Sequence, residues 1–167
     1  ELFFGYGAYR WANRLSTFPV DQLSPLIAKA LEVVPKYKRH ARYFKNHKKT
    51  YPFSSHISST EQNCFSIEEI NDLMKRPISE YSLLYEFEAD FNTLPRELSP
   101  MEKQAFFDLN FYLKDDLLTK VDRASMLNSL EVRVPILDHR IVEYSLNIDP
   151  KLKYKGKNLK YLLKQIL

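Results

Sequence analysis

Hydrophobic positions recur with helical spacing along much of the chain. After Ser24-Pro25 the apolar residues are Leu26, Ile27, Ala30, Leu31 and Val34. This period predicts an amphipathic helix that starts with Ser24 as N-cap and Pro25 in the first turn, and ends before Pro35. A shorter helix or turn is expected over residues 5–15, and another helix over residues 80–91.

Two capping boxes, each a serine followed three residues later by glutamate, predict further helix starts. Ser66 precedes a short helix to about Arg76, and Ser99 precedes a longer pattern. After Ser99 we expect one helix to about Asp115 and a second to about Leu127. Their buried stripe is predicted to consist of Leu113, Leu117, Val121 and Ala124.

The last third of the chain predicts two more helices. Asp138 is placed as the N-cap of a helix through Leu146, and Asn158 as the N-cap of a final helix. The apolar face of the final helix comprises Leu159, Leu162, Leu163 and Ile166. The segment from Leu130 to Val134 carries the main strand signal. The fold class predicted for this part of the protein is therefore mainly α.

The amino-acid composition limits the classes of protein to which the chain can belong. The chain has 167 residues, 44% of them hydrophobic, which suits one globular domain. Its single cysteine cannot form an internal disulfide, and no apolar run reaches the ~20 residues of a membrane span. These features predict a cytoplasmic protein without membrane contact. Only three glycines occur, so a glycine-rich nucleotide loop is absent from this sequence.

Charge is concentrated in one stretch, Lys36–Lys49, which holds seven of the 25 lysines and arginines and accounts for the whole net charge of +4. Tyr37, Tyr43 and Phe44 lie among them. Basic residues interleaved with aromatic rings are typical of single-strand nucleic-acid binding, although a solvated basic surface is the commoner cause. Nucleic-acid binding is kept as the alternative of another class. The histidines and Cys64 match no zinc spacing, so no metal ligands are assigned.

Three motifs occur in order. They are Glu1-Leu2-Phe3-Phe4-Gly5-Tyr6, the run from Lys120 to Arg140 (KVDRASMLNSLEVRVPILDHR), and Gly156-Lys157-Asn158-Leu159-Lys160 with the residues to Lys164. Together they resemble the signature of the glutamine-hydrolysing asparagine synthetases, over residues 1–15 and 108–167. Residues 20–98 form an interval without a clear counterpart in that family. Lys164 stands where arginine is commoner.

The resemblance implies a fold and a reaction. The fold is an α/β adenine-nucleotide α-hydrolase-like (PP-loop) domain, of which residues 1–167 would be the C-terminal portion. The reaction is ATP-dependent amidation of aspartate through an acyl-adenylate, with Mg²⁺ accompanying ATP and ammonia coming from glutamine. Related enzymes act on other carboxylates. Because the PP-loop and the N-terminal glutaminase domain have no counterpart here, we expect the isolated chain to bind ATP poorly and to be inactive alone. A homodimer is compatible with the assignment.

The resemblance also supplies candidate site residues. Lys160, Asp116 and Asp122 are the candidates for catalysis, with the two carboxylates orienting an incoming amine. Glu1, Lys157, Lys160 and Arg123 are the candidates for nucleotide binding, since two lysines at a helix start favour an anion. The competing interpretations are solvated lysines, an Asp116–Lys120 surface pair, and a structural salt bridge from Asp122 or Arg123. The family also carries a later lysine, so two lysines compete for the catalytic role. Glu131, Arg133 and Asp138 are interpreted as scaffold.

Overall fold

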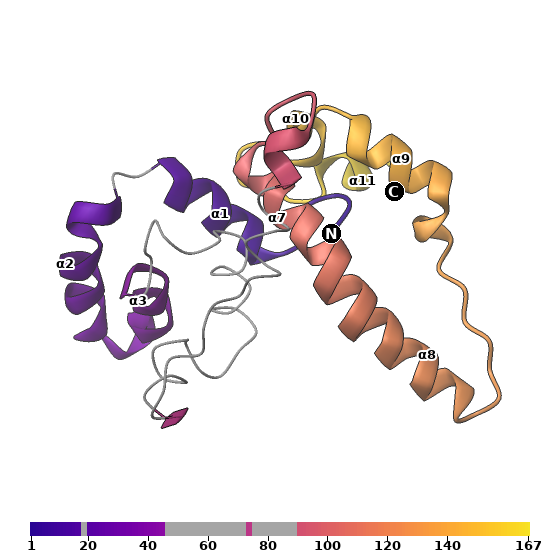
Figure 1. The fold of residues 1–167 in the computed structure, drawn as a ribbon, viewed down its shortest axis with the longest axis horizontal. Helices are drawn as coiled ribbons and strands as arrows, with labels where there is room; N and C mark the ends of the chain where they lie inside the picture. Colours follow the sequence, from indigo (N-terminus) through magenta and orange to yellow (C-terminus); the bar gives the residue numbers. More distant parts are fainter. Residues whose placement is uncertain (18–19, 46–72, 75–89) are drawn as a thin grey trace. The chain divides into compact units, whose positions relative to one another are not determined.

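The computed structural model describes residues 1–17, 20–45, 73–74 and 90–167, and these are largely helical (Figure 1). They divide into two compact units. One contains residues 1–9 and 104–167, and the other residues 10–103. Within the described ranges, β-type pairing is limited to a single bridge between Lys155 and Asn158. The prediction of a mainly α fold is therefore confirmed for these parts of the chain.

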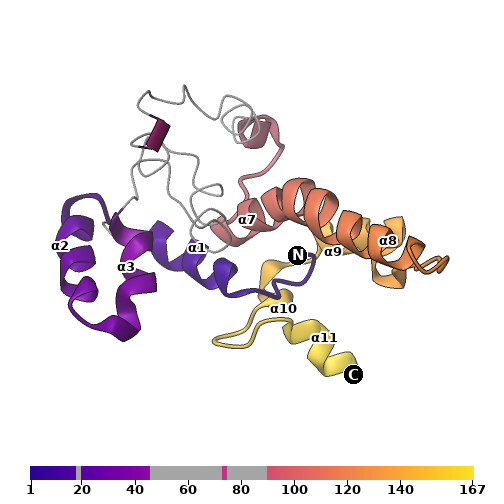
Figure 2. The ribbon, with the colours of Figure 1, turned by 90° about the horizontal axis from the view of Figure 1, so that it is seen from below.

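Three helices open the chain. They are α1 (Gly7–Thr17), α2 (Val20–Glu32) and α3 (Lys38–Lys45), with a 3₁₀ turn η1 (Pro35–Tyr37) between the last two. Helices α2 and α3 pack against each other, as both ribbon views show (Figures 1 and 2). Helix α1 confirms the helix expected over residues 5–15. The basic stretch begins in η1 and continues as helix α3.

Helix α2 begins earlier than the sequence predicted. Its first residue is Val20, so Pro25 lies inside the helix and Ser24 is not its N-cap. A proline inside a helix lacks the N–H that would donate to the carbonyl four residues back and crowds that carbonyl, at a cost of about 3 kcal/mol. Here it falls near the first turns and affects only one bond of the helix. Ser24 is instead buried.

Two predicted helices fall mainly outside the described residues. The helix expected after Ser66 is described only at Leu73 and Met74, which are helical. The helix expected over residues 80–91 is described only at its end, where a 3₁₀ turn η2 spans Asp90–Thr93.

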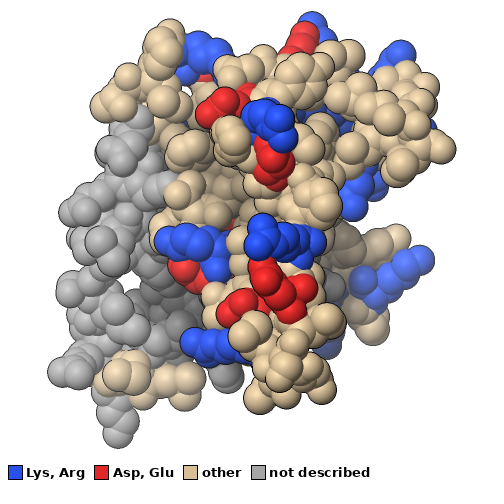
Figure 3. All heavy atoms as spheres, turned by 90° about the vertical axis from the view of Figure 1, so that its right-hand side faces the viewer, with Lys and Arg blue, Asp and Glu red and all other residues tan. Residues whose placement is uncertain are grey.

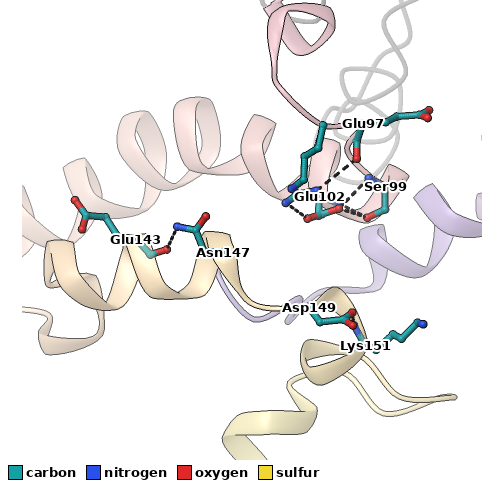
Figure 4. Close-up of polar contacts among 8 residues, drawn as sticks. Glu97, Ser99, Glu102, Glu143, Asn147, Asp149 and Lys151 are labelled. Atoms are coloured by element: carbon teal, nitrogen blue, oxygen red, sulfur yellow. Dashed lines mark hydrogen bonds and ion pairs between the residues drawn. The ribbon is translucent and has the colours of Figure 1, made fainter.

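The capping box at Ser99 forms as predicted at the start of α7 (Pro100–Asp108). The Ser99 backbone N–H and hydroxyl donate to Glu102 Oε2 at 2.9 and 2.7 Å, and the Glu102 N–H donates to Ser99 Oγ at 3.3 Å (Figure 4). Arg96 adds an ion pair of 2.6 Å to the other carboxylate oxygen. Burial alone raises the pKa of Glu102, but the Arg96 and Ser99 hydrogen bonds outweigh it and hold the pKa below its usual value.

Replacing Glu102 with alanine should lower the free energy of unfolding by about 1–2 kcal/mol, because the cap loses its acceptor for two serine donors. Urea denaturation of the chain would measure the loss. Glu97→Ala is the matched control, since Glu97 is exposed and only its backbone carbonyl accepts from Arg96. Equal stability of the two variants would contradict the assignment of the cap.

One helical rod follows, without the break predicted near Asp115. Helix α7 continues as a π-helix, η3 (Leu109–Leu118), and then as α8 (Thr119–Met126). Leu118 and Thr119, at the junction of η3 and α8, both have right-handed helical angles, so only the hydrogen-bond pattern changes there. The predicted end near Leu127 is confirmed. A π-helix has more than four residues per turn. Side chains along it therefore fall on different faces from those that a regular α-helical period predicts.

The buried stripe predicted for this rod is wrong. Neither η3 nor α8 contains a buried residue, and Val121 is 44% exposed. Large apolar side chains continue to be exposed in the extended segment that follows, at Leu127, Leu130, Val132 and Val134. Of the predicted stripe, Leu113 and Leu117 are half-buried, and Val121 and Ala124 are exposed.

Three short helices complete the chain: α9 (His139–Asn147), α10 (Pro150–Lys153) and α11 (Tyr161–Ile166). Asp138 caps α9 as predicted, accepting from the Arg140 N–H at 3.0 Å. Asp149 caps α10 by accepting from the Lys151 N–H at 2.8 Å, and Figure 4 shows these two residues. Between α8 and α9, residues 130–134 are extended but unpaired, and Glu131 forms an exposed ion pair with Arg133. These contacts fit the scaffold role predicted for Glu131, Arg133 and Asp138.

Candidate functional site

The opening residues form a buried corner at Phe4. Leu2, Phe3 and Phe4 are all buried, and Phe4 has a left-handed backbone with φ of 54°. That conformation is costly for a residue with a bulky side chain, so surrounding contacts must hold it. The Phe4 ring lies 5.4 Å from the Tyr9 ring, centroid to centroid.

Lys153, the last residue of α10, packs on this corner. It is 2% exposed, and its ammonium lies 5.0 Å from the centroid of the Phe4 ring. A desolvated cation over an aromatic face contributes about 2 kcal/mol. Because α10 also contacts α11, the opening segment and the last two helices are built into one piece of structure.

A tight turn leads from α10 to α11. Lys155 and Asn158 exchange backbone hydrogen bonds of 3.1 and 2.9 Å around Gly156, whose φ of 62° suits glycine. Asn158 is therefore a turn residue, and the prediction that it caps the final helix is wrong. Lys160 is the N-cap, with a left-handed φ of 54°. The backbone pairing of the turn uses residues 155–158, so the helix begins two residues later than predicted.

The Lys160 side chain crosses the opening segment at Gly5. A β-carbon placed on Gly5 would lie 2.5 Å from Lys160 Cε and 3.4 Å from Lys160 Nζ. Two residues that are 155 positions apart in sequence therefore meet, and the first and third motifs of the sequence share one site. Lys157 lies exposed in the preceding turn.

A buried carboxyl group lies close to Tyr9 and Glu1 of the opening segment. Asp108, at the end of α7, is 3% exposed and accepts a 2.9 Å hydrogen bond from Gln104 Nε2. The fully buried Tyr9 hydroxyl faces the same carboxyl without ordinary hydrogen-bond geometry. Burial raises the Asp108 pKa to about 6, although the Gln104 and Tyr9 interactions pull it down. Burial, followed by the Asp108 charge, raises the Tyr9 pKa well above its usual range.

Glu1 belongs to the same acidic surroundings. One of its carboxylate oxygens, Oε1, is buried without a hydrogen-bond partner among the described residues. Burial and then the Glu1 charge raise the pKa of Tyr6 to about 12. Tyr6 also packs edge-on against Tyr112 of η3, with ring centroids 6.0 Å apart. Glu1 is thus placed beside Tyr6 and Asp108, next to the residues that meet Lys160.

The other predicted site residues lie on the exposed rod. Asp116 pairs with Lys120 at 3.0 Å, with side chains 48% and 65% exposed, which is the surface pair weighed as an alternative. Asp122 and Arg123 are exposed on α8, which both ribbon views show leading away from α11 and the opening segment (Figures 1 and 2). Acidic and basic side chains are interspersed on the face shown in Figure 3. Glu1 lies close enough to Lys160 for the lysine charge to act on its amino group, whereas the α8 residues lie apart from both.

Sequence reasoning missed Asp108, Tyr9 and Gln104. The spacing of Gln104 and Asp108, four residues apart on a helix, was the available signal, because such pairs lie on one face. Nothing in the pattern indicated that this face is buried. The pairing with Tyr9 depends on the tertiary structure alone.

Two of the aromatic residues of the basic stretch, Tyr43 and Phe44, pack against Trp11, whereas Tyr37 is 41% exposed. The Trp11 ring stacks on Tyr43 at 4.3 Å, and Tyr43 is 1% exposed. Phe44 also packs against Trp11, edge-on at 6.0 Å. Tyr43 therefore has no face left for stacking on a base, which removes one support of the nucleic-acid alternative. Residues 46–49 of the stretch lie outside the described residues.

No helix in the described parts of the chain has the length and apolar character needed to cross a membrane. The same parts contain no group of three histidine, cysteine or carboxylate side chains arranged to hold a metal ion.

Comparison with known proteins identifies the family. Residues 1–167 match the sequence model of the asparagine synthase family, including the interval over residues 20–98. The chain therefore belongs to the asparagine synthase family.

Curated relatives carry the same description. The glutamine-hydrolysing asparagine synthetases 1 and 3 of Bacillus subtilis (strain 168) are 37% identical over 67 residues and 42% identical over 65 residues. These alignments cover 40% and 39% of this chain and 11% of each relative, so the matched region spans about a tenth of their length. No solved structure matches the chain.

Proposed function

We propose that the protein carrying this chain is an ATP-dependent carbon–nitrogen ligase that converts aspartate to asparagine. The family assignment supports this reaction, and the observation that carries it is the meeting of Lys160 with Gly5. Two motifs at opposite ends of the sequence come together there, around a cationic side chain whose charge also acts on the amino group of Glu1. The chain would contribute one wall of an α/β PP-loop domain.

The proposed chemistry has two steps. The aspartate side-chain carboxylate attacks the α-phosphorus of ATP, forming an acyl-adenylate and releasing pyrophosphate. Ammonia derived from glutamine then attacks the acyl carbon, and AMP leaves. Negative charge builds up on the phosphate oxygens during the first step, and a fixed cation there stabilises the transition state more than the ground state.

We assign to Lys160 the stabilisation of this negative charge on the phosphate oxygens. Lys160 is an exposed residue, which suits it to meet a phosphate, and the end of its side chain lies over Gly5. Lys157 and Arg123 are proposed as further phosphate contacts. Asp116 and Asp122 are proposed to orient the incoming ammonia. For the three residues on the rod these roles require a substrate or another part of the protein to reach α8.

Mg²⁺ is proposed as the partner of ATP. The described residues do not fit a protein-built metal site, since Glu1 and Asp108 are the carboxylates near the corner and they do not form a three-ligand group. Magnesium commonly keeps several waters and is held by substrate phosphates with one or two carboxylates. We derive no catalytic step from the metal through these residues.

The test is pyrophosphate release by the full-length protein. With ATP, Mg²⁺, aspartate and glutamine or ammonia, we expect one pyrophosphate and one AMP for each asparagine formed. Omitting aspartate should abolish pyrophosphate release. Release with a different carboxylate in place of aspartate would assign the protein to the related amide-forming enzymes, and absence of release with every carboxylate would overturn the proposal.

A further inference from the structure

We propose that Gly5 is a positioning residue for the Lys160 ammonium, so that the absence of a side chain at position 5 fixes where that charge lies. The inference rests on the proposed function for its catalytic consequence. Its structural part depends only on the contact between the two residues.

The first observation concerns the space above Gly5. A β-carbon there would have Lys160 Cε, Nζ and Cδ as its three nearest neighbours, at 2.5, 3.4 and 3.8 Å. No backbone atom is among those three. Gly5 also lacks the positive φ that would itself require glycine. The constraint at position 5 therefore comes from the Lys160 side chain.

The second observation is backbone strain on both sides of the contact. Phe4, immediately before Gly5, and Lys160 each have a φ of 54°, in the left-handed region that L residues rarely occupy. Such residues persist where surrounding structure holds them, and they gather at functional sites. Here the buried Phe4 ring, with Lys153 above it, holds one side of the contact. The tight turn at Gly156 leads into the other.

The third observation concerns what would move. The obstructing atoms are the far end of a long, flexible side chain, and Lys160 is exposed. An alanine at position 5 would therefore displace the end of Lys160 rather than unfold the corner. The Lys160 ammonium would keep its charge but would no longer lie in its wild-type position. A purely structural glycine would give the opposite result, with lost stability and an unmoved lysine.

Gly7 provides the matched control. It lies two residues away, at the start of α1, and a β-carbon there would meet nothing within 4 Å. Gly7→Ala makes the same chemical change in the same segment and leaves Lys160 untouched.

The experiment uses the full-length protein with Gly5→Ala, Gly7→Ala or Lys160→Ala. Lysines are acetylated briefly with acetic anhydride, and the rate at each lysine is read by mass spectrometry, with exposed Lys151 as internal reference. We expect Gly5→Ala to change the Lys160 rate relative to Lys151, and Gly7→Ala to leave it unchanged. Thermal midpoints of the two glycine variants should agree closely. Identical Lys160 labelling in wild type and Gly5→Ala would overturn the proposal, as would a thermal midpoint of Gly5→Ala far below that of Gly7→Ala.

The catalytic consequence is measured separately. For pyrophosphate release, Gly5→Ala should lower kcat about tenfold or more, since misplacing a reacting group by about 1 Å can cost up to about 10²-fold. The KM for ATP should change little, and Gly7→Ala should match wild type. Normal kcat in Gly5→Ala despite altered labelling would overturn the positioning role. If wild type releases no pyrophosphate, the proposed function fails, while the labelling result still decides the contact.

Discussion

Replacing Lys160 with alanine in the full-length protein should lower aspartate-dependent pyrophosphate release by about 10²–10³-fold. Removing one preorganised donor from a developing negative charge commonly has an effect of this size. Lys160 is suited to such a role because its side chain lies across Gly5 and the residue is exposed. The measurement is the initial rate of pyrophosphate release at saturating ATP and aspartate, with folding checked by circular dichroism.

Lys151→Ala is the matched control for charge. Lys151 is an exposed lysine of α10, and its contact with Asp149 uses the backbone N–H, which alanine retains. The Lys151→Ala variant should release pyrophosphate at the wild-type rate. If Lys160→Ala also turns over normally, the role assigned to Lys160 is refuted. The later lysine that the family resemblance implies then becomes the candidate.

Because Asp108 is buried, the free energy of unfolding of the chain should fall as the pH rises from about 4 to about 6. In the folded state burial raises the pKa of Asp108 from 3.8 to about 6. In that window the folded chain keeps a proton that the unfolded chain has lost, so the free energy of unfolding falls with pH. About two pKa units correspond to an upper bound of about 3 kcal/mol. Urea denaturation at successive pH values would measure the slope.

The Asp108→Asn variant isolates this contribution. Asparagine retains a side-chain oxygen that accepts from Gln104 and cannot ionise, so the pH-dependent loss should disappear and the variant should be more stable than wild type at pH 7. The comparison is needed because Glu102, whose folded pKa is lowered, acts with the opposite sign at lower pH. Asp115→Asn, at a side chain that is 60% exposed, serves as control. The same pH slope in wild type and Asp108→Asn would contradict the account.

Where local rules sufficed, the sequence predicted the structure well. The capping box of Ser99 with Glu102 and the cap at Asp138 form with short hydrogen bonds, because each involves residues within three positions of one another. The three ordered motifs were also sufficient to place the chain in its family. Predictions from local signals failed where another local interaction competed. Asn158, for example, forms backbone hydrogen bonds with Lys155 and does not cap α11.

The sequence by itself therefore determined the helical character, two of the caps and the family, and it proposed Lys160 as a candidate site residue. Only the tertiary structure showed that Lys160 meets Gly5, that Asp108 is buried against Tyr9, and that the apolar stripe of α8 is exposed. The physical reason is how far apart in the sequence the interacting residues lie. Caps and turns are decided by hydrogen bonds between near neighbours in the chain, whereas burial, pKa shifts and the meeting of distant side chains depend on which segments pack together, which no local period records.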